Sequence, residues 1–370
     1  MFKILKITKQ GVRLGVLKTA HGILKTPFYM PDATRGFIKL TTNNEVAQTG
    51  TKALVVNTFH LYLQPGLETI SKAGGIHKFM NWSGPLLSDS GGFQVFSLIH
   101  KNSKLGKIDN DKVTFRSPLD GSRHELTPEK SIQIQFALGT DMMVCLDDCP
   151  PNEFSRSDLE LAVARTISWA KRCKAEYLKQ IKKRKLKGAK KPLLFAVIQG
   201  GAEIDLREYC TKELVKIGFD GYGFGARPID ESGNFLEEVL AKTASFIPPG
   251  ALRFALGIGT PEDIMRCAQM GWDMFDCVIP TREGRHGKLF FPGKQETYKN
   301  YQTININNAR FGRDFTVINK KSKISELKKH SRSYLYHLFK LKEILGQKFA
   351  SLNNLEFYQN LLKKIRTSNF

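Results

Sequence analysis

Short, uninterrupted apolar runs alternate along the chain with segments whose apolar residues repeat at helical spacing. The runs cover residues 53–56, 85–87, 142–146, 193–198, 222–224, 254–258 and 274–275. Apolar runs without polar alternation are typical of strands in a parallel sheet that helices cover on both faces. The number of these units, in a chain of 370 residues, favours an α/β fold of the (β/α)₈ TIM-barrel type. An open dinucleotide-binding sheet has little support, because no Gly-x-Gly-x-x-Gly turn follows the first strand.

Helix boundaries are marked by capping residues. One helix opens at Thr127-Pro128-Glu129 and stops at Gly139, and another opens at Thr260-Pro261-Glu262 and stops at Gly271. A capping Thr, then Pro, an acidic first turn and a final Gly are the expected signals. A third helix is expected from Ser155 or Ser157 into the basic tract 182–191, which we interpret as a solvated helix end rather than an RNA site.

The two ends of the chain have different patterns. Residues 1–10 alternate and are basic, which predicts a first strand and no signal peptide, so we expect a cytoplasmic protein. From about residue 319 the apolar residues recur at helical spacing. We therefore expect a barrel domain over residues 1–318 and a C-terminal helical subdomain over residues 319–370. The apolar residues of this helical tail are Leu327, Tyr334, Leu335, Leu338, Leu341, Ile344, Leu345, Leu355, Tyr358, Leu361 and Ile365.

Polar residues or glycines stand where five of the predicted strands end. They are Asp89, Asp147, Gln199, Gly225 and Asp276. The carboxyl ends of barrel strands converge on one face, where catalytic residues gather. A single Asp at a strand end is more often a helix cap, but several of them, each near a glycine, indicate an active site.

The net charge of the chain indicates a type of ligand. The chain carries 57 Lys and Arg against 35 Asp and Glu, a net charge of +22, which favours nucleic acid as the ligand. An AT-rich genome, which raises the Lys content of surfaces in general, explains part of this excess. No apolar run approaches the length of a membrane span, so no membrane association is expected. The six cysteines form no paired framework, as in proteins with reduced thiols.

Two motifs carry candidate chemistry. Ser88-Asp89-Ser90-Gly91-Gly92-Phe93-Gln94 places a carboxylate before two glycines, where a flat ligand can approach the backbone. The second motif, 273–287, places Asp276 before a basic loop that contains Arg282 and Arg285. Arginines spaced in this way suit phosphate contacts.

Together these motifs closely resemble the tRNA-guanine transglycosylase family, of the bacterial type. Further matching stretches, in order over nearly the whole chain, are 57–61, 65–66, 74–77, 119–124, 199–201, 218–222, 308–311 and 331–335. The resemblance implies a TIM barrel that replaces guanine at the wobble position of tRNAs with G-U-N anticodons. The incoming base is a 7-deazaguanine, which is preQ1 in the bacterial branch and queuine in the eukaryotic branch. No nucleotide cofactor is needed.

The resemblance also implies residue roles. Asp276 would be the nucleophile that attacks C1′ and forms a covalent ribosyl-aspartate, and Asp89 the general acid/base. Asp147 and Gln199 would hydrogen-bond the edge of the base, and Phe93 would stack on it. The remaining expected residues are Ser90, Gly225, Ala226, Leu256 and Met274 in the base pocket, and Thr281, Arg282 and Arg285 on the anticodon loop. The alternative for Phe93 is ordinary core packing, and His60, His77, His124 and His286 are interpreted as structural.

The chain departs from the family at two places. The positions of the usual structural zinc ligands fall on Ser322, Ile324, Leu327 and Asn353, none of which is a thiolate or imidazole, so we expect no metal. Zinc loss puts dimerisation in doubt, although a homodimer is still expected.

The second departure lies in the base pocket. Where relatives carry Gly-Gly-Leu-Ala, this chain reads Gly225-Ala226-Arg227-Pro228. Arg227 would repel the aminomethyl cation of preQ1 if it pointed inward, or it could point outward to phosphate. Ile229 argues weakly against queuine.

Two other functions compete with base exchange. A non-catalytic tRNA-binding subunit on the same barrel would not need both Asp89 and Asp276. An unrelated glycoside hydrolase would need neither the Arg282–Arg285 loop nor the pair of Asp147 and Gln199. The sequence therefore favours an active tRNA base-exchange enzyme.

Overall fold

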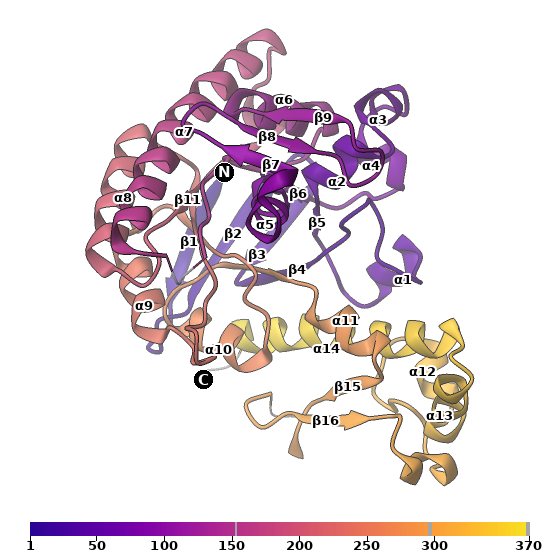
Figure 1. Ribbon diagram of the computed structural model, residues 1–370. Coiled ribbons are helices and arrows are strands. Elements are labelled where there is room, and N and C mark those ends of the chain that lie inside the picture. The colour runs from indigo at the N-terminus through magenta and orange to yellow at the C-terminus, as the bar shows by residue number, and fades with distance from the viewer. Residues whose placement is uncertain (152–153, 295–297, 368–370) are drawn as a thin grey trace.

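The barrel is the centre of the molecule. The computed structural model describes residues 1–151, 154–294 and 298–367, and residues 368–370 of the expected C-terminal subdomain lie outside them (Figure 1). Within the described residues, eight parallel strands form one sheet in the order β4-β14-β13-β12-β11-β10-β6-β5. A parallel bridge between Asp32 and Val55 joins β4 to β5 and closes the ring. The strands are β4 (Phe28–Pro31), β5 (Leu54–Val56), β6 (Leu86–Ser88), β10 (Met142–Val144), β11 (Leu193–Ile198), β12 (Gly221–Phe224), β13 (Leu252–Ala255) and β14 (Met274–Cys277).

The predicted TIM-barrel class is confirmed, and each predicted apolar run overlaps one barrel strand. Strand β4 was not predicted, because it has four residues and ends in a proline, which sequence patterns associate with turns. Residues 1–10 do contain the expected first strand. That strand, β1 (Phe2–Ile7), lies outside the barrel in an antiparallel sheet with β2 (Arg13–Thr19) and β3 (Gly22–Thr26).

The helices surround the barrel, and the predicted caps hold. Thr127 accepts a hydrogen bond from the amide of Lys130, Thr260 from Asp263 and Ser155 from Asp158. The helices are α1 (Asn43–Gln48), α2 (Thr58–Leu63), α3 (Leu67–Lys72), α4 (Ile76–Met80), α5 (Gly92–Lys101), α6 (Pro128–Leu138), α7 (Arg156–Lys183), α8 (Ile204–Ile217), α9 (Glu237–Phe246), α10 (Pro261–Gln269) and α11 (Ile279–Arg285). A small sheet, β7 (Gly106–Ile108), β8 (Val113–Arg116) and β9 (Arg123–Leu126), lies between α5 and α6.

The interior of the barrel is packed with side chains at alternate strand positions. Its cluster includes Phe28 and Met30 of β4, Leu87 of β6, Val197 of β11 and Met274 of β14. Successive side chains of a strand point to opposite faces of the sheet. The position two residues beyond the last interior residue of each of these strands therefore points into the open mouth at the carboxyl ends of the strands.

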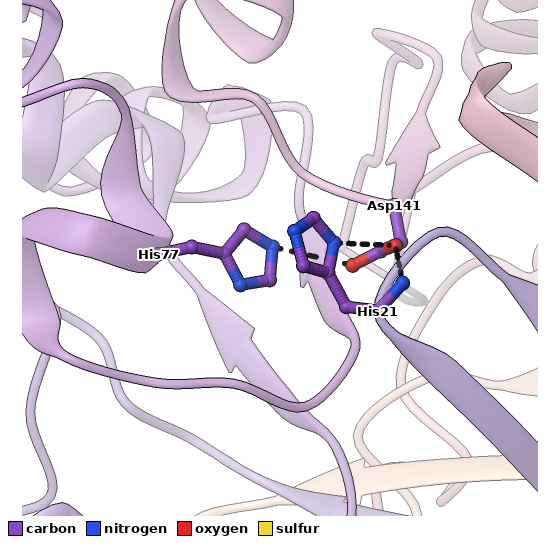
Figure 2. Close-up of side chains that lie close together, drawn as sticks. All are labelled: His21, His77 and Asp141. Atoms are coloured by element: carbon purple, nitrogen blue, oxygen red, sulfur yellow. Dashed lines mark hydrogen bonds and ion pairs between the residues drawn. The ribbon is translucent and has the colours of Figure 1, made fainter.

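Buried ionic contacts close the opposite end of the barrel. The β1–β3 sheet covers this end, where Arg13 Nε lies 3.1 Å from Asp273 Oδ1. Asp141, just before β10, accepts hydrogen bonds from the amides of His21 and Leu86 and lies 2.9 Å from His21 Nδ1 and 3.3 Å from His77 Nε2 (Figure 2). These contacts join the β2–β3 turn, α4 and two barrel strands.

The same three side chains have two of the ligand types that metals use, but their geometry does not suit a metal ion. The His21 and His77 rings are stacked, with centroids 3.6 Å apart and planes at 17°. A histidine binds metal through a lone pair in its ring plane, and nearly parallel rings direct these lone pairs along separate planes. We therefore interpret the cluster as a hydrogen-bonded clamp.

The C-terminal part forms a separate lobe beside the barrel, with α14 running from one to the other (Figure 1). Its elements are β15 (Lys288–Phe291), β16 (Gln302–Asn305), α12 (Ser325–Lys329), α13 (Arg332–Lys340) and α14 (Ile344–Thr367). Its apolar cluster combines Leu289 and Ile306 with Leu335 and Phe349, so its packing begins before the expected boundary at residue 319. In the described part of the chain, no helix has the length and apolar character needed to span a membrane.

Candidate active site

Strand alternation brings the predicted carboxylates to the mouth of the barrel. Leu87 and Met274 face the interior, so Asp89 and Asp276, two residues further along, point into the mouth. Val197 places Gln199 there in the same way. The strand ends thus gather one acidic pair and one amide around a single opening, as the sequence predicted.

Asp89 is held by the start of α2. Its Oδ1 accepts a hydrogen bond from the Thr58 amide at 2.7 Å, and its Oδ2 accepts one from Asn57 Nδ2 at 2.5 Å. Burial raises the pKa of Asp89 to about 7, although the amides of Thr58 and Gly91 oppose the rise, and the charge of Asp276 adds to it. Asp89 is therefore able to gain and lose a proton near neutral pH.

Asp276 has a single protein donor among the described residues. Its Oδ1 accepts a hydrogen bond from the Gly257 amide at 2.9 Å. Burial raises its pKa to about 6, and backbone amides limit the rise. Both pKa values are raised towards neutral pH, and each charge disfavours the other, so near neutral pH the site can hold one carboxylate and one carboxylic acid. Such a separation of two acids lets one attack while the other moves protons.

A third carboxyl, Asp32, belongs to the same site, and the sequence analysis missed it. It follows β4, the strand beside β14. Burial raises its pKa well above the ordinary value, and the charges of Asp276 and Asp89 add to this. No glycine neighbours Asp32 in the sequence. The only available signal was its spacing, since Asp32 continues the alternate positions of Phe28 and Met30.

Asp147 and Gln199 form the second part of the site. The Gln199 amide donates to Asp147 Oδ2 at 2.6 Å, and its Oε1 has no hydrogen-bond partner in the described structure. Burial raises the pKa of Asp147 to about 7, against the effect of this hydrogen bond. Gly225 packs directly on the Gln199 amide, since a Cβ at Gly225 would lie 2.3 Å from Gln199 Nε2. Glycine is therefore required there.

The altered loop keeps a conformation that normally suits glycine. Ala226 has φ +91°, which is strained for a residue with a Cβ. Arg227 is exposed. Beneath the loop, the buried guanidinium of Arg207 donates to the carbonyls of Gly225 at 2.9 Å and Gly201 at 2.6 Å. The sequence analysis missed Arg207 because it lies on an ordinary amphipathic helix.

The other predicted pocket residues differ in accessibility. The Phe93 side chain is 59% exposed at the start of α5, so the alternative of core packing is wrong. Leu256 is half-buried at the end of β13. Ser90 is buried and its Oγ accepts a hydrogen bond from the Gly92 amide at 3.2 Å. Met274 is fully buried in the barrel interior, so it supports the floor under Asp276.

The predicted RNA contacts lie on α11, which packs on α14. Ser351 Oγ donates to the Thr281 carbonyl at 3.4 Å, and Thr281 is buried. Arg282 is exposed and Arg285 half-buried, three residues apart on one side of the helix. Burial, and then the charge of Arg282, lower the pKa of Arg285. Two cations thus stand close together near the mouth.

The positions of the family's zinc ligands do not fit zinc. Ile324 and Leu327 are packed in the apolar cluster of the C-terminal lobe. Asn353 accepts a hydrogen bond from Asn319 Nδ2 and donates to the Phe290 carbonyl, each at 2.9 Å. Ser322 Oγ donates to Glu356 Oε2 at 2.5 Å. Alkyl, amide and hydroxyl groups already bound to protein partners are not a zinc-binding set.

Comparison with known proteins agrees with this geometry. The sequence profile of the queuine tRNA-ribosyltransferase family matches residues 8–368. The queuine tRNA-ribosyltransferase of Caldanaerobacter subterraneus subsp. tengcongensis is 40% identical over 364 residues, covering 98% of this chain and 91% of that protein. The Methylacidiphilum infernorum protein of the same name is 41% identical (98% and 93% covered), and that of Rickettsia typhi 40% (96% and 92%). The chain belongs to the queuine tRNA-ribosyltransferase family.

This membership confirms the family and the enzyme class predicted from the motifs. The queuine tRNA-ribosyltransferases are transferases, and the matched region contains both the acidic pair and the Asp147–Gln199 pair. The match also includes the C-terminal lobe, where the zinc-ligand positions have changed.

Proposed function

We propose that this protein exchanges guanine at the wobble position of tRNAs with G-U-N anticodons for a 7-deazaguanine, with preQ1 as the incoming base. One observation carries the proposal. The mouth of the barrel combines two buried carboxyls with raised pKa values, Asp276 and Asp89, with a hydrogen-bonded pair, Asp147 and Gln199, that suits the edge of a guanine-like base. The names of the relatives support tRNA as the ribosyl substrate.

In the first step, an ionised Asp276 oxygen attacks C1′ of the ribose. A C1′–O bond forms as the bond from C1′ to the guanine nitrogen breaks, and Asp89 gives its proton to the departing base. In the second step, Asp89 takes a proton from the incoming base, whose nitrogen attacks C1′ and releases Asp276 as a carboxylate. Two displacements retain the configuration at C1′.

Base selection is assigned to Asp147, Gln199 and the loop at Gly225. A carboxylate accepts from the N1–H and exocyclic amine of the base, and an amide can donate to O6. Gln199 Nε2 donates one hydrogen to Asp147 and keeps a second for O6, and Gln199 Oε1, which has no protein partner among the described residues, can accept from a donor of the ligand. The preQ1 aminomethyl group would meet backbone carbonyls of the loop, which Arg207 holds in place. Phe93, with its exposed ring, would stack on the base.

The partners follow from charge. Arg282 and Arg285, in a chain with net charge +22, would bind phosphates of the anticodon loop. We also propose a homodimer, as the resemblance to the family implies, with the C-terminal lobe held by its own apolar core. Light scattering of the purified protein would test this.

The test is incorporation of labelled guanine into unmodified tRNA with a G-U-N anticodon. Wild-type protein should incorporate guanine, and Asp276→Asn should not. Absence of incorporation by wild type would favour the non-catalytic subunit. Release of guanine without incorporation would favour a hydrolase. Competition among preQ1, preQ0 and queuine in this assay would identify the incoming base, and strongest competition by queuine would contradict the preQ1 assignment.

A further inference from the structure

Asp32 occupies a position in the mouth equivalent to those of Asp89 and Asp276. Phe28 and Met30 of β4 face the barrel interior, so Asp32, two residues further along, points the same way. Met30 pairs with Asp276 across β4 and β14, and Asp32 bridges Val55 of β5. The Asp32 carboxyl therefore lies beside Asp276, on the adjacent strand.

The side of Asp276 on which Asp32 lies indicates which part of the substrate it can contact. The base-reading residues Asp147, Gln199 and Gly225 follow β10, β11 and β12, which are reached from β14 through β13. Strand β4 lies on the other side of β14. Asp32 thus flanks Asp276 on the side away from the base pocket, where the ribose and its phosphates would lie.

The Asp32 carboxyl lacks the protein donors that its two neighbours have. Asp89 accepts hydrogen bonds from Asn57 and Thr58, and Asp276 from Gly257. For Asp32, the described residues supply neither a hydrogen bond nor an ion pair to the carboxyl group. A half-buried carboxyl without a partner, inside a reaction site, is suited to a substrate group. Its raised pKa leaves it able both to donate and to accept a hydrogen bond.

The stereochemistry of a ribonucleoside identifies that group. The base and the 2′-hydroxyl lie on opposite faces of the ribose ring, and a nucleophile that displaces the base approaches from the face opposite the base. The nucleophile therefore shares a face with the 2′-hydroxyl, on the carbon next to C1′. Inside a tRNA the 3′-oxygen is esterified, so the 2′-hydroxyl is the free one. Hydrogen bonds to the hydroxyl beside the reacting carbon strengthen in glycosyl-transfer transition states.

We propose that Asp32 is a further substrate-binding residue, whose carboxyl group hydrogen-bonds to the 2′-hydroxyl of the nucleotide that undergoes exchange. This assignment rests on the proposed base exchange. It makes Asp32 a determinant of ribose over deoxyribose at that one nucleotide.

The experiment compares two stem-loop RNAs that differ only in ribose or 2′-deoxyribose at the exchanged guanosine. Guanine incorporation is measured for wild type, Asp32→Val and Asp32→Asn. Wild type should lose about tenfold in kcat/KM on the deoxy substrate, the worth of about one hydrogen bond. Asp32→Val should lose a similar factor on the ribo substrate and show almost no difference between the two. Asp32→Asn, with a similar shape and an amide, should recover part of the discrimination.

A matched control is Glu68→Gln, which removes an exposed carboxyl on α3 that pairs with Lys72 and should keep the wild-type ratio. Thermal unfolding of each variant establishes that it is folded. A merely structural role for Asp32 would reduce activity on both substrates equally, and an unchanged ribo-to-deoxy ratio in Asp32→Val would overturn the assignment. Inactivity of wild type on the ribo substrate would refute the base exchange itself, which separates the two failures.

Discussion

Both ends of the barrel bury aspartates, but the hydrogen bonds to these aspartates and the shifts of their pKa values differ. At the closed end, Asp141 receives two backbone amides and lies against two histidines. Burial alone would raise its pKa, but hydrogen bonds from His77, Leu86 and His21 outweigh this and lower it. At the open end, Asp276 has one amide donor and a pKa raised to about 6.

This contrast separates structural from chemical carboxylates in one fold. Where the protein supplies donors and positive charge, an aspartate stays ionised and stabilises the fold. Where donors and positive charge are few, ionisation of a buried aspartate costs free energy, which contacts with a substrate can offset. Asp276 shows this with its single protein donor among the described residues, whereas for Asp89 burial raises the pKa to about 7 in spite of hydrogen bonds from Asn57 and Thr58. Both carboxyls can therefore change protonation near neutral pH.

The largest effect is expected from Asp276→Asn at the open end, where the activity should fall and the stability should rise. Asp276→Asn should lower the guanine incorporation rate by roughly a thousandfold or more, because the nucleophile is lost. It should also raise the free energy of unfolding at pH 7 by about 1 kcal/mol, because a buried charge disappears. Incorporation assays would measure the rate, and urea unfolding would measure the stability. A lower free energy of unfolding in Asp276→Asn would contradict the proposed difference between the two ends of the barrel.

The closed end should respond in the opposite way. Asp141→Asn should lower the free energy of unfolding by about 2–3 kcal/mol, because the amide cannot accept all the bonds that Asp141 accepts. The rate per folded molecule should stay near wild type. Since the folded state lowers the pKa of Asp141, its stabilising effect is fully present above its ordinary pKa. The effect is lost as the pH falls below that value and through the lower pKa of the folded state. Wild type should therefore lose more stability than Asp141→Asn over that range.

The pH dependence of exchange should be bell-shaped. Asp276 must be ionised and Asp89 protonated for guanine to depart, so the single-turnover rate should fall below about pH 6 and above about pH 7. Each limb should approach tenfold per pH unit. A rate that is flat between pH 5 and pH 9 would contradict the assigned roles.

A smaller effect is expected in the pocket loop. Ala226→Gly should raise the free energy of unfolding by about 1 kcal/mol, because glycine adopts φ +91° without strain. Thermal unfolding would measure the change. Gly233→Ala, at an exposed glycine with φ +83°, is a control that should change stability in the opposite direction.

The smallest expected effect concerns the C-terminal lobe, where Asn353 and Ser322, at two of the family's ligand positions, form hydrogen bonds with Asn319 and Glu356. Metal analysis of the purified protein should find no stoichiometric zinc, and a chelator should leave the unfolding temperature unchanged. One zinc per chain would show that other residues bind it.

The sequence revealed the strands and the catalytic pair more readily than their surroundings. Runs such as 193–198 are apolar throughout, and Asp89 and Asp276 stand in long, distinctive motifs. Asp32 and Arg207 were not identified from the sequence, because their roles depend on contacts between distant segments. Arg207, for example, becomes informative only when its guanidinium meets the carbonyls of Gly201 and Gly225.

Helix α14 also has a consequence for how the chain folds. Arg366 donates to the Pro27 carbonyl and Gln359 to that of Tyr29, contacts between residues 339 and 330 positions apart. Contacts at such separation form slowly, because a long loop must close first. During synthesis β4 is made well before its α14 neighbour, since Tyr29 and Gln359 are 330 positions apart in the chain. Until α14 has been made, β4 lacks these contacts and partly folded chains are prone to aggregate. Shortening α14 should therefore reduce the soluble yield more than the loss of its contacts in the folded protein would suggest.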